Sequence, residues 1–135
     1  MVLTFLDRYR DFGLLILRIG IGIAFLFHGF PKLVGGADVW ARLGENAGLA
    51  FAAVPAGFIA SFAEFFGGIC LILGFMMRPM LVLLLGTMIG ASYYHITAGS
   101  SHWHSTELAI LFFSLMFIGP GTYSLDERFK KSGQR

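Results

Sequence analysis

Residues 55–77 read PAGFIASFAEFFGGICLILGFMM, a run of 23 positions in which Glu64 is the only charged residue. A helix needs about 20 apolar residues to cross the hydrocarbon core of a bilayer. Pro55 suits the first turn of such a helix, where its missing N–H leaves no hydrogen bond unmade. The run therefore predicts a transmembrane helix with one acidic side chain near its middle.

Three more apolar runs accompany this one, and together they give four predicted membrane spans. The spans cover residues of about 12–30, 55–77, 79–98 and 104–118. We expect Pro31 and the pair Gly35–Gly36 to end the first span, and Arg78–Pro79 to close the second, because proline and glycine stop helices. The predicted fold is all-α, a transmembrane four-helix bundle that forms a single domain over residues 1–135.

The composition agrees with a protein whose main solvent is lipid. Of the 135 residues, 56% are hydrophobic and 13% are charged, whereas about 25% of a soluble domain is charged. The single Cys70 excludes a disulfide framework. The net charge of +2 is too small and too scattered for a nucleic-acid partner, because phosphate binding needs a clustered basic face. The partner that the composition predicts is the lipid bilayer.

Basic residues outside the spans predict the orientation. Only Lys32 and Arg42 fall on the side that holds the first and third loops. Seven fall on the other side: Arg8, Arg10, Arg78, Arg128, Lys130, Lys131 and Arg135. Since loops rich in Lys and Arg stay in the cytoplasm, both termini are expected to be cytoplasmic.

Two short helices are expected outside the spans. In the first loop, Asp38 is expected to cap a surface helix on which Trp40 and Leu43 point the same way. After the fourth span, Ser124 followed three positions later by Glu127 has the spacing of a capping box. This second pattern predicts a short basic helix along the inner membrane surface.

Two charged residues lie deep inside the predicted spans. A charge at the middle of a bilayer costs at least about 2.5–3.5 kcal/mol, so Arg18 and Glu64 should face the bundle interior. At 1.5 Å per residue, Arg18 lies roughly 19 Å and Glu64 roughly 13 Å below the outer ends of their helices. We therefore expect an ion pair between them. The pair could serve a ligand site, or it could only fix the packing of the first two helices.

A second polar group is predicted nearer the outer surface. His28, His95 and Glu107 should share one layer roughly 5 Å below that surface. Arg18 and Lys32 recur at helical spacing on one face of the first span, with His28 at its edge. If these faces meet, the bundle contains a polar funnel that opens outward, with the buried ion pair at its floor.

Each residue at the rim of this funnel also has a simpler explanation. A histidine near a helix end is commonly an interface residue, and Glu107 in a first turn is favoured by the helix dipole. His102 and His104 beside Glu107 also resemble metal-ligand spacing. A loop with two histidines and no cysteine is more typically solvated, so no metal site is assigned.

Several ordered motifs resemble the DoxX family over nearly the whole chain. They are residues 17–22 (LRIGIG), 27–33 (FHGFPKL), 63–68 (AEFFGG), 73–79 (LGFMMRP) and 119–126 (GPGTYSLD), together with His95 and Glu107–Leu108. The positions that match the family's polar pattern are Arg18, His28, Lys32, Glu64, His95 and Glu107.

This resemblance implies a multi-pass protein of the bacterial or archaeal cytoplasmic (inner) membrane with four transmembrane helices. Relatives include a subunit associated with quinone-linked thiosulfate oxidation and members described in membrane oxidoreductase complexes. More distant relatives perform disulfide chemistry with paired cysteines. This chain has only Cys70, so that activity is not expected here.

The first functional hypothesis is an accessory subunit of a membrane oxidoreductase system that binds a quinone or similar small molecule in the outward-opening polar pocket. Glu64 and Glu107 would act catalytically by relaying protons. The residues assigned to ligand binding are Arg18, His28, Lys32 and His95.

Electrons would have to come from a redox partner protein, because no residues here can hold a redox centre. A second copy of the chain is a further possible partner, in a homo-oligomer. The alternative hypothesis is non-enzymatic: a membrane scaffold or solute-binding module in which the pair of Arg18 and Glu64 is purely structural.

Overall fold

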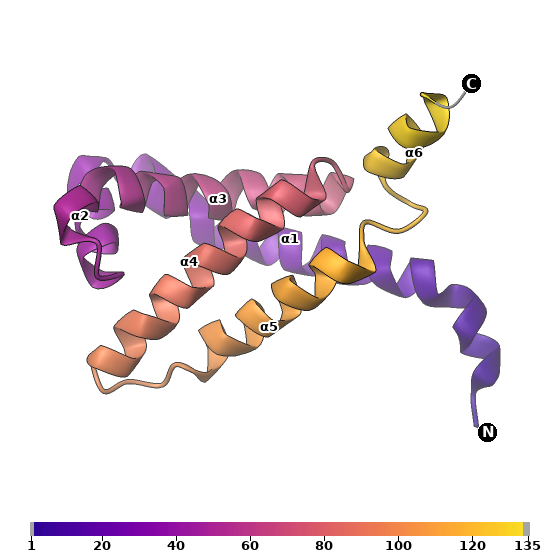
Figure 1. The fold of residues 1–135 in the computed structure, drawn as a ribbon, viewed down its shortest axis with the longest axis horizontal. Helices are drawn as coiled ribbons and strands as arrows, with labels where there is room; N and C mark the ends of the chain where they lie inside the picture. Colours follow the sequence, from indigo (N-terminus) through magenta and orange to yellow (C-terminus); the bar gives the residue numbers. More distant parts are fainter. Residues whose placement is uncertain (1, 134–135) are drawn as a thin grey trace.

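The computed structural model describes residues 2–133, and every regular element in that part of the chain is helical (Figure 1). The elements are η1 (Thr4–Tyr9), α1 (Arg10–Val34), α2 (Ala37–Asn46), η2 (Ala50–Ala52), α3 (Ala53–Leu73), α4 (Met77–Thr97), α5 (Trp103–Ile118) and α6 (Leu125–Ser132). α2 lies at one end of the molecule, and α6 lies with both chain ends at the other. We call these the α2 end and the α6 end.

Three helical stretches are long and apolar enough to cross a membrane: Thr4–Val34, Ala50–Leu73 and Met77–Thr97. The apolar helix α5 is shorter, with 16 residues, which at 1.5 Å per residue extend roughly 24 Å. The all-α class is thus confirmed. A fourth span and the cytoplasmic location of both termini stay predictions.

The predicted helix boundaries are partly wrong. Pro31 lies inside α1, which continues to Val34 and ends, as predicted, at Gly35–Gly36. α3 ends at Leu73, and Gly74 adopts a left-handed conformation with φ of 64°, which glycine tolerates without steric cost. Arg78 and Pro79 therefore open α4 instead of closing α3, and a proline in a first turn breaks no helical hydrogen bond.

Glycines bring α1 and α3 into close contact. A Cβ atom built on Gly22 would lie 2.6 Å from the carbonyl oxygen of Gly68, and one built on Gly68 would lie 2.7 Å from that of Gly22. A Cβ on Gly29 would overlap the backbone of Phe65. Small residues let transmembrane backbones approach closely, so these positions set the distance between the two helices.

The buried apolar core lies toward the α6 end. It uses the first half of α4, from Met77 to Met88, and the second half of α5, around Phe112 and Leu115. The ring of Phe25 on α1 meets that of Phe112 edge-on, with centroids 5.2 Å apart. Toward the α2 end, α3 and α4 are less completely packed, and the main cavity of the described chain lies there.

The surface helix predicted in the first loop is present as α2, but its cap differs from the prediction. The N-cap residue is Gly36, and no side chain makes a capping hydrogen bond there. Asp38 lies within the first turn, where a carboxylate is still favoured by the helix dipole. Trp40 fixes α2 in place by donating from Nε1 to the carbonyl oxygen of Lys32 at 3.0 Å and by packing on Phe58.

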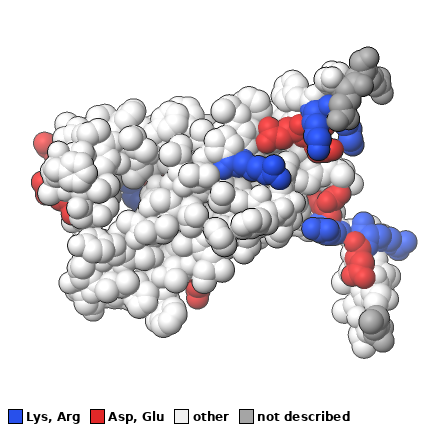
Figure 2. Space-filling view, viewed as in Figure 1, with Lys and Arg blue, Asp and Glu red and all other residues white. Residues whose placement is uncertain are grey.

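The predicted helix after the last apolar segment is α6, and Ser124 is its N-cap residue as predicted. The Ser124 side chain accepts a hydrogen bond from the backbone N–H of Glu127 at 3.2 Å. Figure 2 shows Lys and Arg gathered at the α6 end, with few on the rest of that face.

Candidate functional site

Arg18 does not pair with Glu64, so the predicted ion pair is wrong. The Arg18 side chain is buried, with 1% of its surface exposed. Its guanidinium donates one hydrogen bond to the carbonyl oxygen of Pro120 and another, 2.8 Å long, to that of Tyr123. Arg18 therefore binds the turn between α5 and α6, at the α6 end.

The direction of helical side chains explains the error. A side chain on an α-helix leans toward the N-terminus of its own helix. The N-terminus of α1 lies at the α6 end, so the long side chain of Arg18 extends away from Glu64. Lys32, near the C-terminus of the same helix, extends from the α2 end toward the middle of the molecule, which is where Glu64 lies.

Lys32 is the partner of Glu64. The Lys32 Nζ atom donates to both carboxylate oxygens, at 2.8 Å to Oε1 and 2.6 Å to Oε2. The Glu64 side chain is 5% exposed and that of Lys32 is 35% exposed. The buried carboxylate is thus compensated by an ammonium group that remains partly open to its surroundings.

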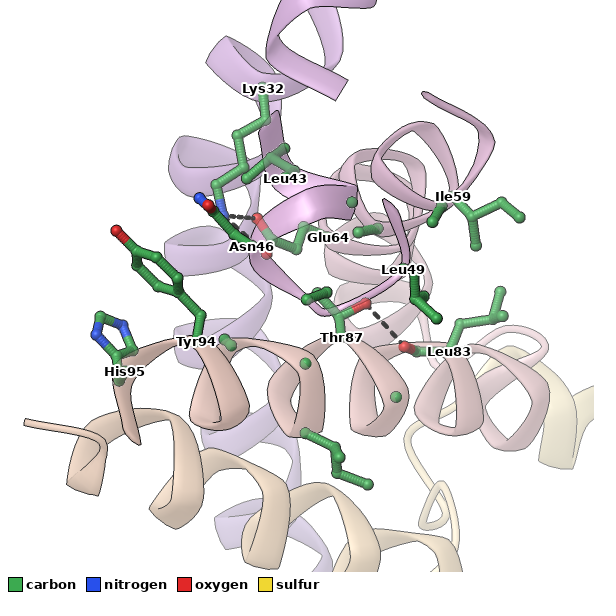
Figure 3. Close-up of a pocket in the computed structure, with 18 of the residues that line it drawn as sticks. Lys32, Leu43, Asn46, Leu49, Ile59, Glu64, Leu83, Thr87, Tyr94 and His95 are labelled. Atoms are coloured by element: carbon green, nitrogen blue, oxygen red, sulfur yellow. Dashed lines mark hydrogen bonds and ion pairs between the residues drawn. The ribbon is translucent and has the colours of Figure 1, made fainter. Parts of the chain in front are cut away.

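This ion pair lies in the wall of a cavity of about 680 Å³ (Figure 3). That volume is within the roughly 300–1,000 Å³ typical of small-molecule sites. α1 contributes Lys32, α2 contributes Leu43 and its neighbours, α3 contributes Glu64, and α4 contributes a long face that ends at His95. Most of the remaining lining residues are apolar or small.

Three polar side chains that are not among the predicted site residues also line the cavity: Asn46, Thr87 and Tyr94. Asn46 lies at the end of α2, and Tyr94 lies next to His95 on α4. In Figure 3 the Tyr94 ring extends from α4 toward the side of the cavity where Asn46 and Lys32 lie. Asn46 falls in a loop-like polar segment, and only the packing of α2 on α3 brings it to the site.

The structure brings together only part of the predicted funnel. Lys32, Glu64 and His95 line one cavity, and His95 Nδ1 also lies 2.9 Å from the hydroxyl of Ser100. His28 and Glu107 are exposed and are not among the residues that line it. His28 and Glu107 therefore do not join the other three residues in one pocket, and the shared depth of His28, His95 and Glu107 stays a prediction.

His102 and His104, at the start of α5, do not gather with other ligands around a metal position in the described part of the chain. The His102 ring stacks on Trp103 with centroids 4.9 Å apart, and His104 is exposed. Within residues 2–133, no group of three His, Cys, Asp or Glu side chains is placed to hold a metal ion.

A separate hydrogen-bond network joins the elements at the α6 end. The carboxylate of Asp126 accepts from the backbone N–H groups of Met76 and Met77, at 2.9 and 3.0 Å, and so caps α4. The Asp126 N–H donates to the carbonyl oxygen of Gly74 at 3.0 Å. A Cβ on Gly74 would meet both Ser124 and the Arg18 guanidinium, so this network is tightly packed and structural.

Comparison with known proteins identifies relatives over most of the chain. The sequence model of the DoxX family matches residues 13–97, a segment that includes the ion pair and His95, so the resemblance is confirmed. The inner membrane protein YphA of Escherichia coli K12 is 36% identical over 143 positions, covering 90% of this chain and 97% of that protein. An uncharacterized protein of Haemophilus influenzae Rd is 29% identical over 136 positions, covering 93% and 97%. No solved structure matches the chain.

Proposed function

This chain belongs to the DoxX family, and from that premise we propose that it is an inner-membrane accessory subunit of an oxidoreductase system. In this proposal it binds a quinone or a similar small molecule in the cavity beside Lys32 and Glu64. The observation that supports the proposal is an ion pair with a buried carboxylate in the wall of an otherwise largely apolar cavity.

The ammonium group of Lys32 has one donor left for a ligand. A lysine ammonium carries three N–H donors, and two hydrogen bonds go to Glu64. Within residues 2–133, no other acceptor bonds to Nζ in the structure. A ligand oxygen that enters the cavity can accept the third N–H, as the carbonyl of a quinone would.

The charge of the site favours a neutral ligand. The charges of Lys32 and Glu64 cancel each other. The attraction of the ammonium for an anionic ligand would therefore be offset by repulsion from the carboxylate. A quinone is neutral, flat and apolar apart from its carbonyl oxygens. It therefore matches a largely apolar cavity with one hydrogen-bond donor, while His95 and Tyr94 supply further polar groups.

Reduction of a bound quinone to the quinol requires two electrons and two protons. The electrons would come from a redox partner protein. Glu64 and Lys32 would be the groups nearest the ligand oxygen, and Glu64 would pass protons toward it through the ammonium of Lys32. Glu107 has no role in this proposal, because it is exposed and does not line the cavity.

The test measures quinone binding by variants of the ion pair. Purified protein in lipid nanodiscs is heated with and without decylubiquinone, because a ligand that binds only the folded form raises the melting temperature. We expect the shift in wild-type protein to disappear in Lys32→Met, because this change removes the ammonium that donates to the ligand oxygen. Glu45→Gln is the control, since Glu45 is exposed on α2 and does not line the cavity.

Removing one partner of a buried pair can destabilise the fold by roughly 3–5 kcal/mol. The double variant Lys32→Met with Glu64→Gln leaves no unpaired charge, so it keeps the test valid if a single variant fails to fold. Loss of binding in the double variant and retention in Glu45→Gln support the proposal. Absence of a shift in wild-type protein contradicts it.

The alternative function is a non-enzymatic membrane scaffold. It is favoured by the fact that Lys32 and Glu64 join α1 to α3, because interhelical polar contacts also stabilise packing in lipid. A scaffold predicts that no quinone raises the melting temperature and that the pair variants change stability alone.

A further inference from the structure

The cavity is elongated along α4. On that helix its lining residues extend from Val82 to His95, a distance of roughly 20 Å at 1.5 Å per residue. The polar lining residues Asn46, Tyr94 and His95 belong to the α2-end part. The part that continues toward Val82 and Leu83 is apolar except for Thr87, whose hydroxyl donates to the carbonyl oxygen of Leu83 at 2.9 Å (Figure 3).

The apolar part of the cavity opens sideways between α3 and α4. Ile59, Val82 and Ile89 line it and are each more than half exposed, at 51%, 52% and 57%. Both helices are long and apolar enough to cross a membrane, so the exposed surfaces of these residues face acyl chains. The opening therefore connects the cavity with the hydrocarbon core of the bilayer.

Small residues on both helices create the space. Ala56 and Ala60 lie on α3, and Gly86 and Gly90 lie on α4. A Cβ built on Gly86 would have no neighbouring atom within 4 Å. Gly86 lines the cavity and is exposed, so a side chain at this position would project into open space at the cavity wall.

We propose that the ligand is a neutral amphiphile with a hydrocarbon tail, a tailed quinone, that enters sideways from the bilayer between α3 and α4. Its head group accepts a hydrogen bond from Lys32, and its tail passes Gly86 and leaves over Val82. This inference rests on the proposed function. It adds the class of ligand and the route that the ligand takes.

The charge of the site disfavours the anionic phospholipids, which are other tailed molecules of the bilayer. Their head groups carry a net negative charge, and the carboxylate of Glu64 offsets the attraction of Lys32 for it. An anionic head would also leave part of its charge uncompensated in a low-dielectric site. A neutral head group avoids that cost.

The test fills the apolar part of the cavity beside Gly86 that would hold the tail, here called the tail channel. It leaves the ion pair of Lys32 and Glu64 intact. Gly86→Leu places a side chain in the open space beside α4. Gly20→Leu is the matched control, because Gly20 lies on membrane helix α1, has no atom within 4 Å of its Cβ position and does not line the cavity. Binding in nanodiscs is measured with decylubiquinone and with ubiquinone-0, which has the same head group and no tail.

We expect Gly86→Leu to weaken binding of decylubiquinone at least about tenfold, because each buried methylene contributes roughly a factor of four. Binding of ubiquinone-0 should change less than about twofold, and Gly20→Leu should behave as wild type with both probes. Comparing variants in the same nanodiscs cancels the partition of the tailed probe into lipid.

Two results would overturn the inference and leave the proposed function standing. One is binding of both probes that depends on Lys32 and Glu64 and is unchanged by Gly86→Leu. The other is a co-purifying phospholipid, seen by native mass spectrometry, that occupies the channel and is lost in Gly86→Leu but is not displaced by decylubiquinone. If neither probe binds to wild-type protein, both the proposed function and the inference are wrong.

Discussion

The contacts of a side chain at this site depend on its position along the helix and on the direction in which it leans. Arg18 and Lys32 lie on the same helix, yet Arg18 binds the carbonyl oxygen of Tyr123 at the α6 end and Lys32 binds Glu64. The sequence correctly predicts that Glu64 needs a cationic partner, because a lone carboxylate in lipid is costly. Counting residues gives a depth for each Cα atom, but it does not include the lean of the side chain toward the helix N-terminus. For this reason the sequence predicts Arg18, and not Lys32, as the partner of Glu64.

Capping of α4 by Asp126 gives a prediction at the residue scale. Asp126→Ala removes two hydrogen bonds to the backbone N–H groups of Met76 and Met77. Loss of a side-chain cap typically costs about 0.5–2 kcal/mol of stability. The free energy of unfolding, measured by denaturation in detergent micelles, should fall by that amount.

Asp38→Ala is the control for this measurement. Asp38 lies in the first turn of α2, where no side chain makes a capping hydrogen bond. Its removal should change the free energy of unfolding by less than about 0.5 kcal/mol. Equal losses in the two variants would show that Asp126 contributes through its charge alone.

At the scale of elements, the sequence predicts which segments are helical better than where they end. Long apolar runs require helices in lipid, since only internal hydrogen bonds can satisfy the backbone there. Boundaries depend on single positions, and Pro31 does not end α1, which continues to Val34. The cavity could not be predicted, because it results from large side chains packing between α4 and α5 at the α6 end and from glycines and alanines between α3 and α4.

The close contact between α1 and α3 gives a prediction about elements. In Gly29→Ala the new Cβ would lie 2.8 Å from the Cα atom of Phe65 and from the carbonyl carbon of Glu64. Backbone atoms cannot turn aside as a flexible side chain can, so the helices must separate, at a cost of about 1–3 kcal/mol. We expect a lower melting temperature for the purified protein.

Gly20→Ala tests whether this effect comes from helix contact. Gly20 has no atom within 4 Å of its Cβ position, and alanine stabilises a helix by up to about 1 kcal/mol relative to glycine. The control should therefore melt at the same temperature as wild type or above it. A similar loss in both variants would contradict the assigned role of Gly29.

At the scale of the whole molecule, charge and topology give one consistent arrangement. The chain ends and α6 lie at the same end (Figure 1), and Lys and Arg gather there (Figure 2). In inner-membrane proteins such an end faces the cytoplasm. Lys32 belongs to the opposite end, and its ammonium is drawn inward to Glu64. If this end is cytoplasmic, as the sequence predicts, the cavity lies in the outer half of the bilayer, with its polar part nearest the outer surface.

The orientation can be tested with single cysteines in a Cys70→Ala background. Glu45 is exposed on α2 and Lys131 is exposed on α6, so Glu45→Cys and Lys131→Cys report on opposite ends. A membrane-impermeant maleimide should label the cysteine at position 45 in intact spheroplasts and the cysteine at 131 only after lysis, because four spans keep both termini cytoplasmic. Labelling of both positions in intact spheroplasts would mean that an odd number of helices crosses the bilayer. α5, with its 16 residues, would then be the helix that does not span.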